Sequence, residues 1–467
     1  MQDQEEGSTE SEADDLDPTV EELLELMEAF RSNQDDLLYT ADYIERQEHE
    51  LDDYRERAHT SIEREYPHVP EGLFERLWDL LEVELEGIGA PQLKSDKEGL
   101  HTRDTEQHKD AVRAVIRELP EDCGQEYFSD VARAIVRMQD SPQTTKLLSS
   151  LLTTVVADFE VLMGNLLRVV ITNVPQIISS SNQTFTWAQI CEFEDLESFR
   201  QHQIDKFVDS LLYGSYSDWL EFVGKKLHID VPPLATDAST IEIFQRRHMI
   251  VHNGAVASKQ YVEACKPSPH KKGLDEYLGV DVPYLRHASD RLMSIATFLV
   301  FATCQKFVKD QDSVQSMESY VGGVVSYHLL QDKRFEAVQQ LSQVVKASSF
   351  NDLGAGYRYQ VNSWVAAKRT GQLKQHQEDI ENWNTSVLQP VFRLAKHALL
   401  DELTEGHKLV QKMRASDELP LRHWLTWPLL SELRDYSQKH ARVTSVESEE
   451  IGVLVSSAID EGESENV

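Results

Sequence analysis

The sequence predicts an all-α protein, and three features of it support this prediction. Apolar residues recur at helical spacing, amid many charged residues, from Val20 to about Tyr66. A dense apolar stretch from Leu147 to Pro175 has the length of a helix in the centre of a bundle. After residue 313, short segments of helical periodicity alternate with turns. We therefore expect a central helical bundle, flanked by an acidic N-terminal helical region and a C-terminal helical-hairpin array.

Length, charge and cysteine usage limit the class of protein. A chain of 467 residues is expected to hold about three domains. The first 150 residues carry 40 acidic and 15 basic side chains, so they account for most of the net charge of −35. We interpret this acidity as a solvated surface that keeps the protein soluble or lets it tolerate a salty cytoplasm. The four cysteines are isolated and the start of the chain is acidic, which predicts a reduced, cytoplasmic protein without structural zinc or a signal peptide.

The first 145 residues divide into a tail and a helical region. Residues 1–18 are rich in Glu, Asp, Ser and Gln and are expected to form a disordered acidic tail. Residues 19–145 form the acidic helical region, which begins with a long amphipathic helix or helical hairpin. This element is either an arm for oligomerisation or a partner, or a lid on its own domain. After Pro67 and Pro70, further helices are expected over residues 73–85, 111–119 and 127–138.

The same region contains a polar loop with His101, Glu106 and His108. Their spacing follows no known rule for metal ligands, and the loop is polar throughout. The sequence therefore predicts no metal site here, and we expect no metal or cofactor elsewhere in the chain.

The central domain is expected to span residues 146–312. Its first helix is the apolar stretch that Pro175 ends. Asp158, Glu160 and Arg168 would lie in the middle of a membrane span at a cost of several kcal/mol, so we expect a buried helix and no membrane contact. The helices expected to follow it cover residues 187–193, 195–212, 215–227, 238–253 and 282–309.

Residues 313–443 are expected to form the C-terminal helical hairpins. The positions of Tyr359, Trp364 and Leu394 are similar to those in hairpins of the tetratricopeptide type, although no clean period of 34 residues occurs. Such a stack would offer a concave surface to a protein partner, or it completes the core. Residues 444–467 are expected to be an acidic tail. The helices expected here cover residues 317–331, 334–347, 355–370, 373–382, 388–400, 403–414 and 425–438.

The residue types for phosphodiester chemistry meet in the segment 245–254. Arg247 supplies a permanent charge and forked donors for a phosphate, and His252 titrates near neutral pH. Such a pair can cleave RNA without a metal. An imidazole accepts the proton of a ribose 2′-OH, a second group protonates the leaving 5′-oxygen, and a cation stabilises the charge on phosphorus.

The surroundings of this pair distinguish it from chance occurrences of the same spacing, such as Arg103/His108 and Arg434/His440. Residues 247–254 read Arg-His-Met-Ile-Val-His-Asn-Gly, with a polar residue after the arginine, an apolar run and an Asn-Gly stop. This segment resembles the R-x4-6-H signature of the HEPN superfamily, and the resemblance extends over roughly residues 147–310.

The resemblance implies a HEPN-like bundle and a metal-independent endoribonuclease of single-stranded RNA. Its products would carry a 2′,3′-cyclic phosphate and a 5′-hydroxyl, and a role in stress response or phage defence is implied by the resemblance alone. On a regular helix Arg247 and His252 lie about 140° apart, so one helix does not focus both on one phosphate. A homodimer that brings two copies of the motif face to face, as HEPN nucleases do, resolves this difficulty.

The predicted site residues have distinct roles. We assign His252 to general acid/base catalysis, Arg247 to stabilisation of the transition state, and His248 to a supporting or second proton transfer. Alternatives remain open: Asn253 caps the helix, Glu160 forms a bundle salt bridge, and Arg247 and His252 brace two helices. Tyr261 either contacts a base or packs against the motif, and packing is favoured for a lone tyrosine. The expected supporting residues are Asn253, Glu160, Asp158 and Arg246, and the expected substrate-binding residues are Tyr261, Lys259, Lys225 and Lys226.

One position departs from a subset of the superfamily. In HEPN toxins that a partner nucleotidyltransferase modifies, a tyrosine commonly stands two places after the histidine, where this chain has Gly254. Control by tyrosine modification is therefore not expected at this position. The competing interpretation of the whole chain is a non-catalytic HEPN scaffold that binds RNA or a nucleotide and recruits a protein partner through its C-terminal helices. A metal-dependent hydrolase would instead lose its activity in EDTA.

Overall fold

The computed structural model describes residues 16–70, 72–86, 105–119, 121–137, 142–177 and 184–440. These residues are helical and contain no β-strand, so the predicted all-α class is confirmed. A single isolated β-bridge joins Val256 and Tyr277. The predicted tail 444–467, residues 1–15 of the predicted tail 1–18, and His101 lie outside the described residues.

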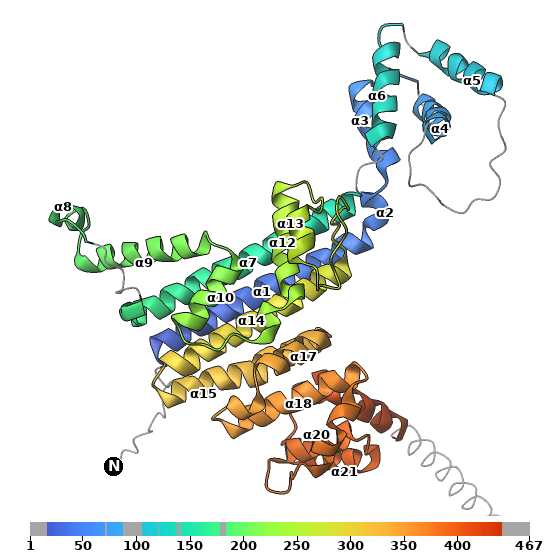
Figure 1. Ribbon diagram of the computed structural model, residues 1–467. Coiled ribbons are helices and arrows are strands. Elements are labelled where there is room, and N and C mark those ends of the chain that lie inside the picture. The colour runs from blue at the N-terminus through green and yellow to red at the C-terminus, as the bar shows by residue number, and fades with distance from the viewer. Residues whose placement is uncertain are drawn as a thin grey trace, which may run out of the picture.

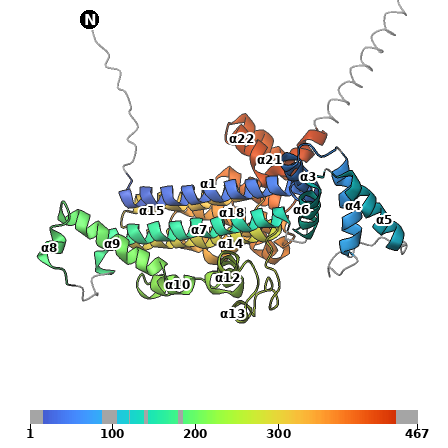
Figure 2. The same cartoon turned by 90° about the horizontal axis from the view of Figure 1, so that it is seen from above.

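Three long helices lie side by side in the centre of the protein (Figures 1 and 2). Phe30 of the first contacts Phe159 of the second edge to face, with ring centroids 6.3 Å apart. The first helix starts where Pro18 fixes the backbone and the Asp17 carboxylate accepts a hydrogen bond from the Thr19 amide. The sequence places this helix in the N-terminal region, whereas its apolar face contributes to the main core. The three are α1 (Pro18–Arg46), α7 (Gln143–Asn173) and α14 (Val282–Phe307).

The central position of α7 explains its apolar composition. By length and composition alone, α7 is the one helix among the described residues that is able to cross a bilayer. Half of its most apolar window is buried inside the protein, where α7 packs against α1, α9, α12 and α14. Burial among other helices accounts for such a sequence without a membrane.

A layer of shorter helices covers one side of α7 (Figure 2). Side chains cap three of them: the carboxylates of Asp195 and Asp237 and the hydroxyl of Ser215 each accept a hydrogen bond from the third residue that follows. The predicted helices of residues 187–253 are all present within a few residues of their expected ends. The layer contains η1 (Pro175–Ile177), α8 (Trp187–Ile190), α9 (Leu196–Leu212), α10 (Tyr216–Lys225), α11 (Pro233–Thr236), α12 (Ala238–His252) and α13 (Lys259–Ala264).

A lobe with its own small core extends from one end of α1 (Figure 1). Leu77, Trp78 and Val131 are fully buried in it. The Asp52 carboxylate accepts a hydrogen bond of 2.9 Å from the Thr144 amide, so the two connections of the lobe to the main core meet at one point. The second core thus begins after α1 rather than at residue 19. Its helices are α3 (Tyr54–Glu65), α4 (Leu73–Glu86), α5 (Thr105–Glu118) and α6 (Gly124–Arg137), whereas the short α2 (Glu48–Leu51) packs on α1 and α7.

The C-terminal helices stack in sequence on α14: α17 lies on α14, α18 on α17, α20 on α18 and α21 on α20. Each helix predicted between residues 317 and 438 overlaps an observed one, whereas the similarity to tetratricopeptide hairpins stays a prediction. A last helix covers residues 431–440. The others are α15 (Gln311–Ser319), the π-helix η2 (Tyr320–Val325), α16 (Ser326–Gln331), α17 (Phe335–Val344), η3 (Ala347–Ser349), α18 (Leu353–Arg369), η4 (Leu373–His376), α19 (Gln377–Asn382), α20 (Pro390–Leu399), α21 (Leu403–Ala415), α22 (Leu421–Thr426) and η5 (Pro428–Leu430).

A buried arginine ties these parts together. The guanidinium of Arg334 donates hydrogen bonds to Asp290 and Ser289 of α14 and to Asp35 of α1, over 2.7, 3.1 and 2.9 Å. Arg334 itself precedes α17 and is almost completely buried. One side chain therefore connects the first helix, the central helix and the C-terminal stack.

The close approach of η2 to α18 requires a glycine. A Cβ atom at Gly322 would lie 2.7 Å from the carbonyl oxygen of Ala355. We expect Gly322→Ala to lower the free energy of unfolding by about 1–3 kcal/mol, because the two backbones must separate. Gly323→Ala is the matched control, since its nearest neighbour lies at 3.5 Å. Urea denaturation followed by circular dichroism measures both, and equal midpoints would contradict the steric explanation.

Candidate functional site

The motif occupies the second half of α12, which packs between α7 and α13. The apolar side of this helix, including Ile243 and Met249, is buried, whereas His248 and His252 are exposed. The helix ends where Gly254 adopts a positive φ of 60°. The Asn253 side-chain amide donates a hydrogen bond of 2.6 Å to the carbonyl oxygen of Val256, so it stabilises the loop that follows the helix. Asn253 is also the residue at which α12 ends, and there its backbone N–H donates a hydrogen bond to the carbonyl oxygen of Met249.

Arg247 extends toward α7 and not toward the end of its own helix. Its Nη2 atom lies 3.3 Å from Oε2 of Glu160, and both side chains are about 30% exposed. The Nε atom of Arg247 is buried and has no hydrogen-bond partner among the described residues. The structure thus brings together two of the predicted site residues, and the carboxylate of Glu160 fixes the direction of the guanidinium.

The two histidines of the motif lie next to each other on the solvent side of α12. The ring centroids of His248 and His252 are 4.7 Å apart, and the ring planes meet at 49°. Among the described residues, no hydrogen bond joins either ring to Arg247. This separation agrees with the angular offset expected from the sequence, because residues 248 and 252 are one turn apart and residue 247 points elsewhere.

Arg246 and Tyr261 belong to a buried network, which corrects their assignments as supporting and substrate-binding residues. Arg246 donates a hydrogen bond of 2.8 Å to Glu242, and the hydroxyls of Tyr261 and Tyr284 each donate one of 2.6 Å to the same carboxylate. Arg246 also donates to the carbonyl oxygens of Gly279 and His270. Tyr261 is 0% exposed, so it cannot contact a substrate. Burial, and then the hydrogen bond to Glu242, raises its pKa far above the usual range.

The hydrogen bonds of this network hold the segment after α12 against the helix. Glu242 and Arg246 form an ion pair one turn apart within α12, and the three bonds to Glu242 satisfy its charge in a dry environment. Cys265 lies in the same small core, where burial raises the pKa of its thiol to about 12. Sequence reasoning missed Glu242 and Tyr284, although the spacing of Glu242 and Arg246 on the apolar side of a predicted helix is a usable signal for such a pair.

The remaining predicted residues lie at different places. Asp158 faces α1, where its carboxylate lies 3.5 Å from the side-chain amide of Gln34, so it does not support Arg247 or His252. Partial burial raises the pKa of Asp158. Lys225, Lys226 and Lys259 are exposed, and Lys225 forms an ion pair with Glu221. All three lysines are accessible, whereas the position of Asp158 corrects its assignment as a supporting residue.

A basic cavity of about 340 Å³ lies beside the motif helix, between the loop that follows α13 and the start of α14. Lys271 and Lys272 line it and are exposed, whereas Arg246 forms part of its wall while its charge is neutralised by Glu242. The cavity is large enough for a phosphate and part of a sugar. Two lysines face the one carboxylate of Asp281 here, so the recess is positively charged, and the sequence did not predict it as a site.

A half-buried histidine beside this cavity is expected to make stability depend on pH. Burial, and then the positive charge of His270, lowers the pKa of His287 from 6.5 to about 4. The two rings are 4.4 Å apart. Below pH 6.5 His287 binds a proton in the unfolded chain but stays neutral in the folded chain. The contribution of neutral His287 to stability is therefore complete above pH 6.5 and is lost between pH 6.5 and 4.

We therefore expect the wild type to lose about 1–2 kcal/mol relative to His287→Leu when the pH falls from 7.5 to 4.5, after allowance for solvent screening. Urea denaturation of both proteins across this pH range measures the difference. A constant difference would show that His287 has an ordinary pKa in the folded protein.

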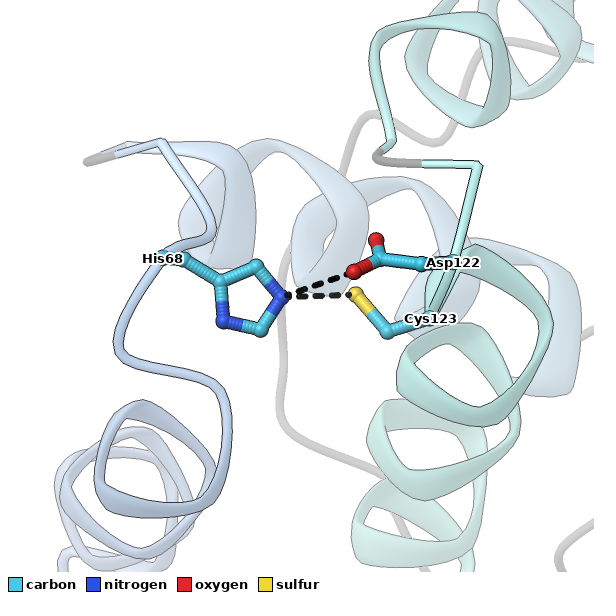
Figure 3. Close-up of side chains that lie close together, drawn as sticks. All are labelled: His68, Asp122 and Cys123. Atoms are coloured by element: carbon cyan, nitrogen blue, oxygen red, sulfur yellow. Dashed lines mark hydrogen bonds and ion pairs between the residues drawn. The ribbon is translucent and has the colours of Figure 1, made fainter.

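A second group of reactive side chains lies in the N-terminal lobe, where His68, Asp122 and Cys123 meet (Figure 3). The sequence predicts no metal site here, because Cys123 is isolated from the other cysteines and no histidine lies near it in the sequence. His68 is separated from the other two by more than 50 positions, so no ligand spacing in the sequence points to them. Their proximity comes from the fold alone.

Comparison of the chain with protein families, with curated proteins and with solved structures finds no match. The resemblance of residues 247–254 to the HEPN signature therefore rests on the residues of this chain, and a function has to be argued from the arrangement of Arg247, His248 and His252.

Proposed function

We propose that the protein is a metal-independent endoribonuclease that cleaves single-stranded RNA. The observation that carries this proposal is the pair of exposed imidazoles, 4.7 Å apart at the free end of α12, one residue from an arginine held in place by Glu160. Two imidazoles can serve as base and acid in one reaction, and an oriented arginine can stabilise a phosphorane.

In the proposed reaction the ribose 2′-oxygen attacks the adjacent phosphorus while His252 accepts its proton. The bond between phosphorus and the 5′-oxygen breaks, and His248 donates a proton to that oxygen. The products are a 2′,3′-cyclic phosphate and a 5′-hydroxyl, and no water or metal ion enters this step. Arg247 stabilises the extra negative charge on the phosphoryl oxygens, for which a forked guanidinium is well suited.

The separation of Arg247 from the histidines supports a site composed of two protomers. Val161 follows Glu160 in α7 and is 62% exposed, and Val251 lies one turn after Arg247 and is 48% exposed. Exposed apolar side chains beside a half-complete site favour coverage by a second copy of the chain. In such a homodimer, Arg247 of one protomer would serve the histidines of the other.

Basic residues around α12 provide contacts for an RNA strand despite the acidity of the whole chain. Lys259 begins α13, Lys271 and Lys272 line the cavity beside the motif helix, and Lys225 and Lys226 end α10. Contacts of this kind bind the phosphate backbone without sequence preference and weaken with salt. We place this activity in the cytoplasm, in keeping with four free cysteines.

The second candidate function is a non-catalytic scaffold. It is favoured by a groove of about 420 Å³ among the C-terminal helices, whose lining includes the aromatic rings of Tyr327, Phe392 and Trp427. A groove with aromatic walls is a common binding place for a segment of a partner. In this case the central bundle would bind RNA or a nucleotide and leave it intact.

The test is incubation of the purified protein with end-labelled single-stranded RNA in EDTA, followed by mapping of the product ends. The proposal expects cleavage that resists EDTA and leaves cyclic phosphates. RNA that is bound but intact favours the scaffold. Loss of cleavage in EDTA, or products with 3′-hydroxyl ends, contradicts the proposed mechanism.

A further inference from the structure

The N-terminal lobe brings a histidine, a carboxylate and a cysteine to one point on its surface. His68 lies in the connection between α3 and α4, and Asp122 and Cys123 lie in the connection between α5 and α6. One ligand atom of each lies within 4.8 Å of the others. Figure 3 shows that the same ring nitrogen of His68 faces both the sulfur and the carboxylate.

The distances match the edges of a tetrahedral zinc site. Zinc bonds of 2.0–2.3 Å to nitrogen, oxygen and sulfur place neighbouring ligand atoms roughly 3.3–3.7 Å apart. In the structure, Nε2 of His68 lies 3.4 Å from Sγ of Cys123 and 3.9 Å from Oδ2 of Asp122. The ligand atoms of Asp122 and Cys123 lie within 4.8 Å of each other, so a side-chain movement of at most about 1.5 Å would complete the geometry.

Hydrogen bonds inside the group join Cys123 to His68 over 3.4 Å and to Asp122, but they leave the pair His68 and Asp122 without a direct bond. The distance of 3.9 Å between His68 and Asp122 is too long for a hydrogen bond. A single ring nitrogen with one proton or one lone pair also serves one partner at a time. By contrast, a cation placed between the three ligand atoms would contact all of them at once. Nitrogen, sulfur and oxygen ligands together are typical of Zn²⁺, whereas Mg²⁺ and Ca²⁺ take oxygen ligands.

The fold holds the two connections against each other beside the cluster. The hydroxyl of Tyr66 donates a hydrogen bond of 2.6 Å to Asp130 of α6, and the rings of Tyr66 and Tyr127 contact edge to face, with centroids 5.3 Å apart. His68 follows Tyr66 by two positions, so its backbone is placed close to the start of α6. The histidine and the two ligands from the other connection are therefore positioned before any ion binds.

A bound metal ion would also stabilise this lobe. Among its described residues the lobe has a core of 12 buried apolar side chains, and a metal ion that joins two connections adds to the stability of a small core. Residues 54–137 carry 19 acidic and 12 basic side chains, a balance of −7 that attracts cations. His68 and Asp122 are 53% and 76% exposed, so an ion can reach them from solvent.

We propose that His68, Asp122 and Cys123 bind one Zn²⁺ ion, with water as the fourth ligand, and that this ion joins the two connections of the N-terminal lobe. The site is separate from the α12 motif and serves the stability of the lobe. Its test is therefore independent of whether the protein cleaves RNA.

The first experiment is a titration of the full-length, untagged, metal-free protein with Co²⁺, which reports its ligands by absorption. We expect one equivalent to bind with a sulfur-to-cobalt charge-transfer band, and Zn²⁺ to displace it. Cys123→Ser removes the band, and His68→Ala weakens Zn²⁺ binding by roughly 100-fold or more, since even outer-shell partners of a metal contribute 10- to 100-fold. Cys191→Ser, at a cysteine that is exposed whereas Cys123 is partly buried, leaves the titration unchanged.

A second measurement keeps the proposal open to refutation if a variant misfolds. One equivalent of Zn²⁺ is expected to slow alkylation of Cys123 by N-ethylmaleimide at least about tenfold, with Cys191 unprotected, as read by mass spectrometry of the wild type. The absence of a charge-transfer band, its persistence in folded Cys123→Ser, or equal alkylation of Cys123 with and without Zn²⁺ would overturn the proposal.

Discussion

His252→Ala is expected to lower RNA cleavage by roughly 10²–10⁴-fold, below detection in an end-labelled assay, because the general base of the proposed reaction is lost. The fold should not change, since His252 is exposed at the end of α12 and its contact in the structure is with the ring of His248. His49→Ala, at another exposed histidine on α2, is the matched control and should keep full activity. Equal cleavage by wild type and His252→Ala would place the activity in a contaminant or at another site.

A site composed of two protomers allows a stricter test, in which two inactive variants are mixed. Arg247→Ala and His252→Ala should each be inactive alone. If Arg247 of one protomer serves the histidines of the other, a mixture of the two variants regains about one quarter of the wild-type activity, because half of the dimers are mixed and each of these has one intact site. If the site lies within a single protomer, the mixture stays inactive. Subunit exchange is followed by native mass spectrometry in the same samples.

Arg334→Leu is expected to lower the free energy of unfolding by about 3–5 kcal/mol, the largest effect on stability that we predict. The substitution leaves the carboxylates of Asp290 and Asp35 without their shared partner. Burial already raises the pKa of both carboxyls, and the guanidinium of Arg334 opposes this increase, so its loss favours their protonation.

Urea denaturation measures this loss, with the exposed Arg414→Leu as the matched control, expected to remain within about 0.5 kcal/mol of the wild type. The double variant Arg334→Leu/Asp290→Leu should recover part of the loss, because it no longer buries the carboxylate of residue 290. A single variant as stable as the wild type would show that the three helices do not depend on this arginine.

The predictable part of the fold consists of elements with a strong periodic signal. The apolar residues of α7 and α14, and the caps and prolines near their ends, define these helices from local sequence. The partner of α1 was not predictable, because an amphipathic helix can dock its one apolar face on any apolar surface. More than 90 residues separate α1 from α7 along the chain, and no local signal relates them.

The candidate site likewise has a part that the sequence predicts and a part that it does not. The positions of His248 and His252 follow from helical spacing, and the pairing of Arg247 with Glu160 joins two residues that the sequence already singled out. For Tyr261 the sequence left packing against the motif and contact with a base both open, because a tyrosine near a motif carries no sign of its own burial. Its position depends on Glu242, whose charge needs several donors in a dry environment, and only the packed structure shows which donors are within reach.

The position of the lobe between α1 and α7 has a consequence for synthesis of the chain. α1 leaves the ribosome first, but the helices that cover its apolar face end at Asn173 and Phe307. At 5–20 residues per second, α1 waits roughly 6–25 s for α7 and longer for α14. The lobe, whose contacts are nearer in sequence, can form during this interval. A nascent chain stalled so that residue 143 has just left the ribosome is therefore expected to carry a protease-resistant lobe beside an α1 that is still cleaved, and the bundle closes only when translation is well advanced.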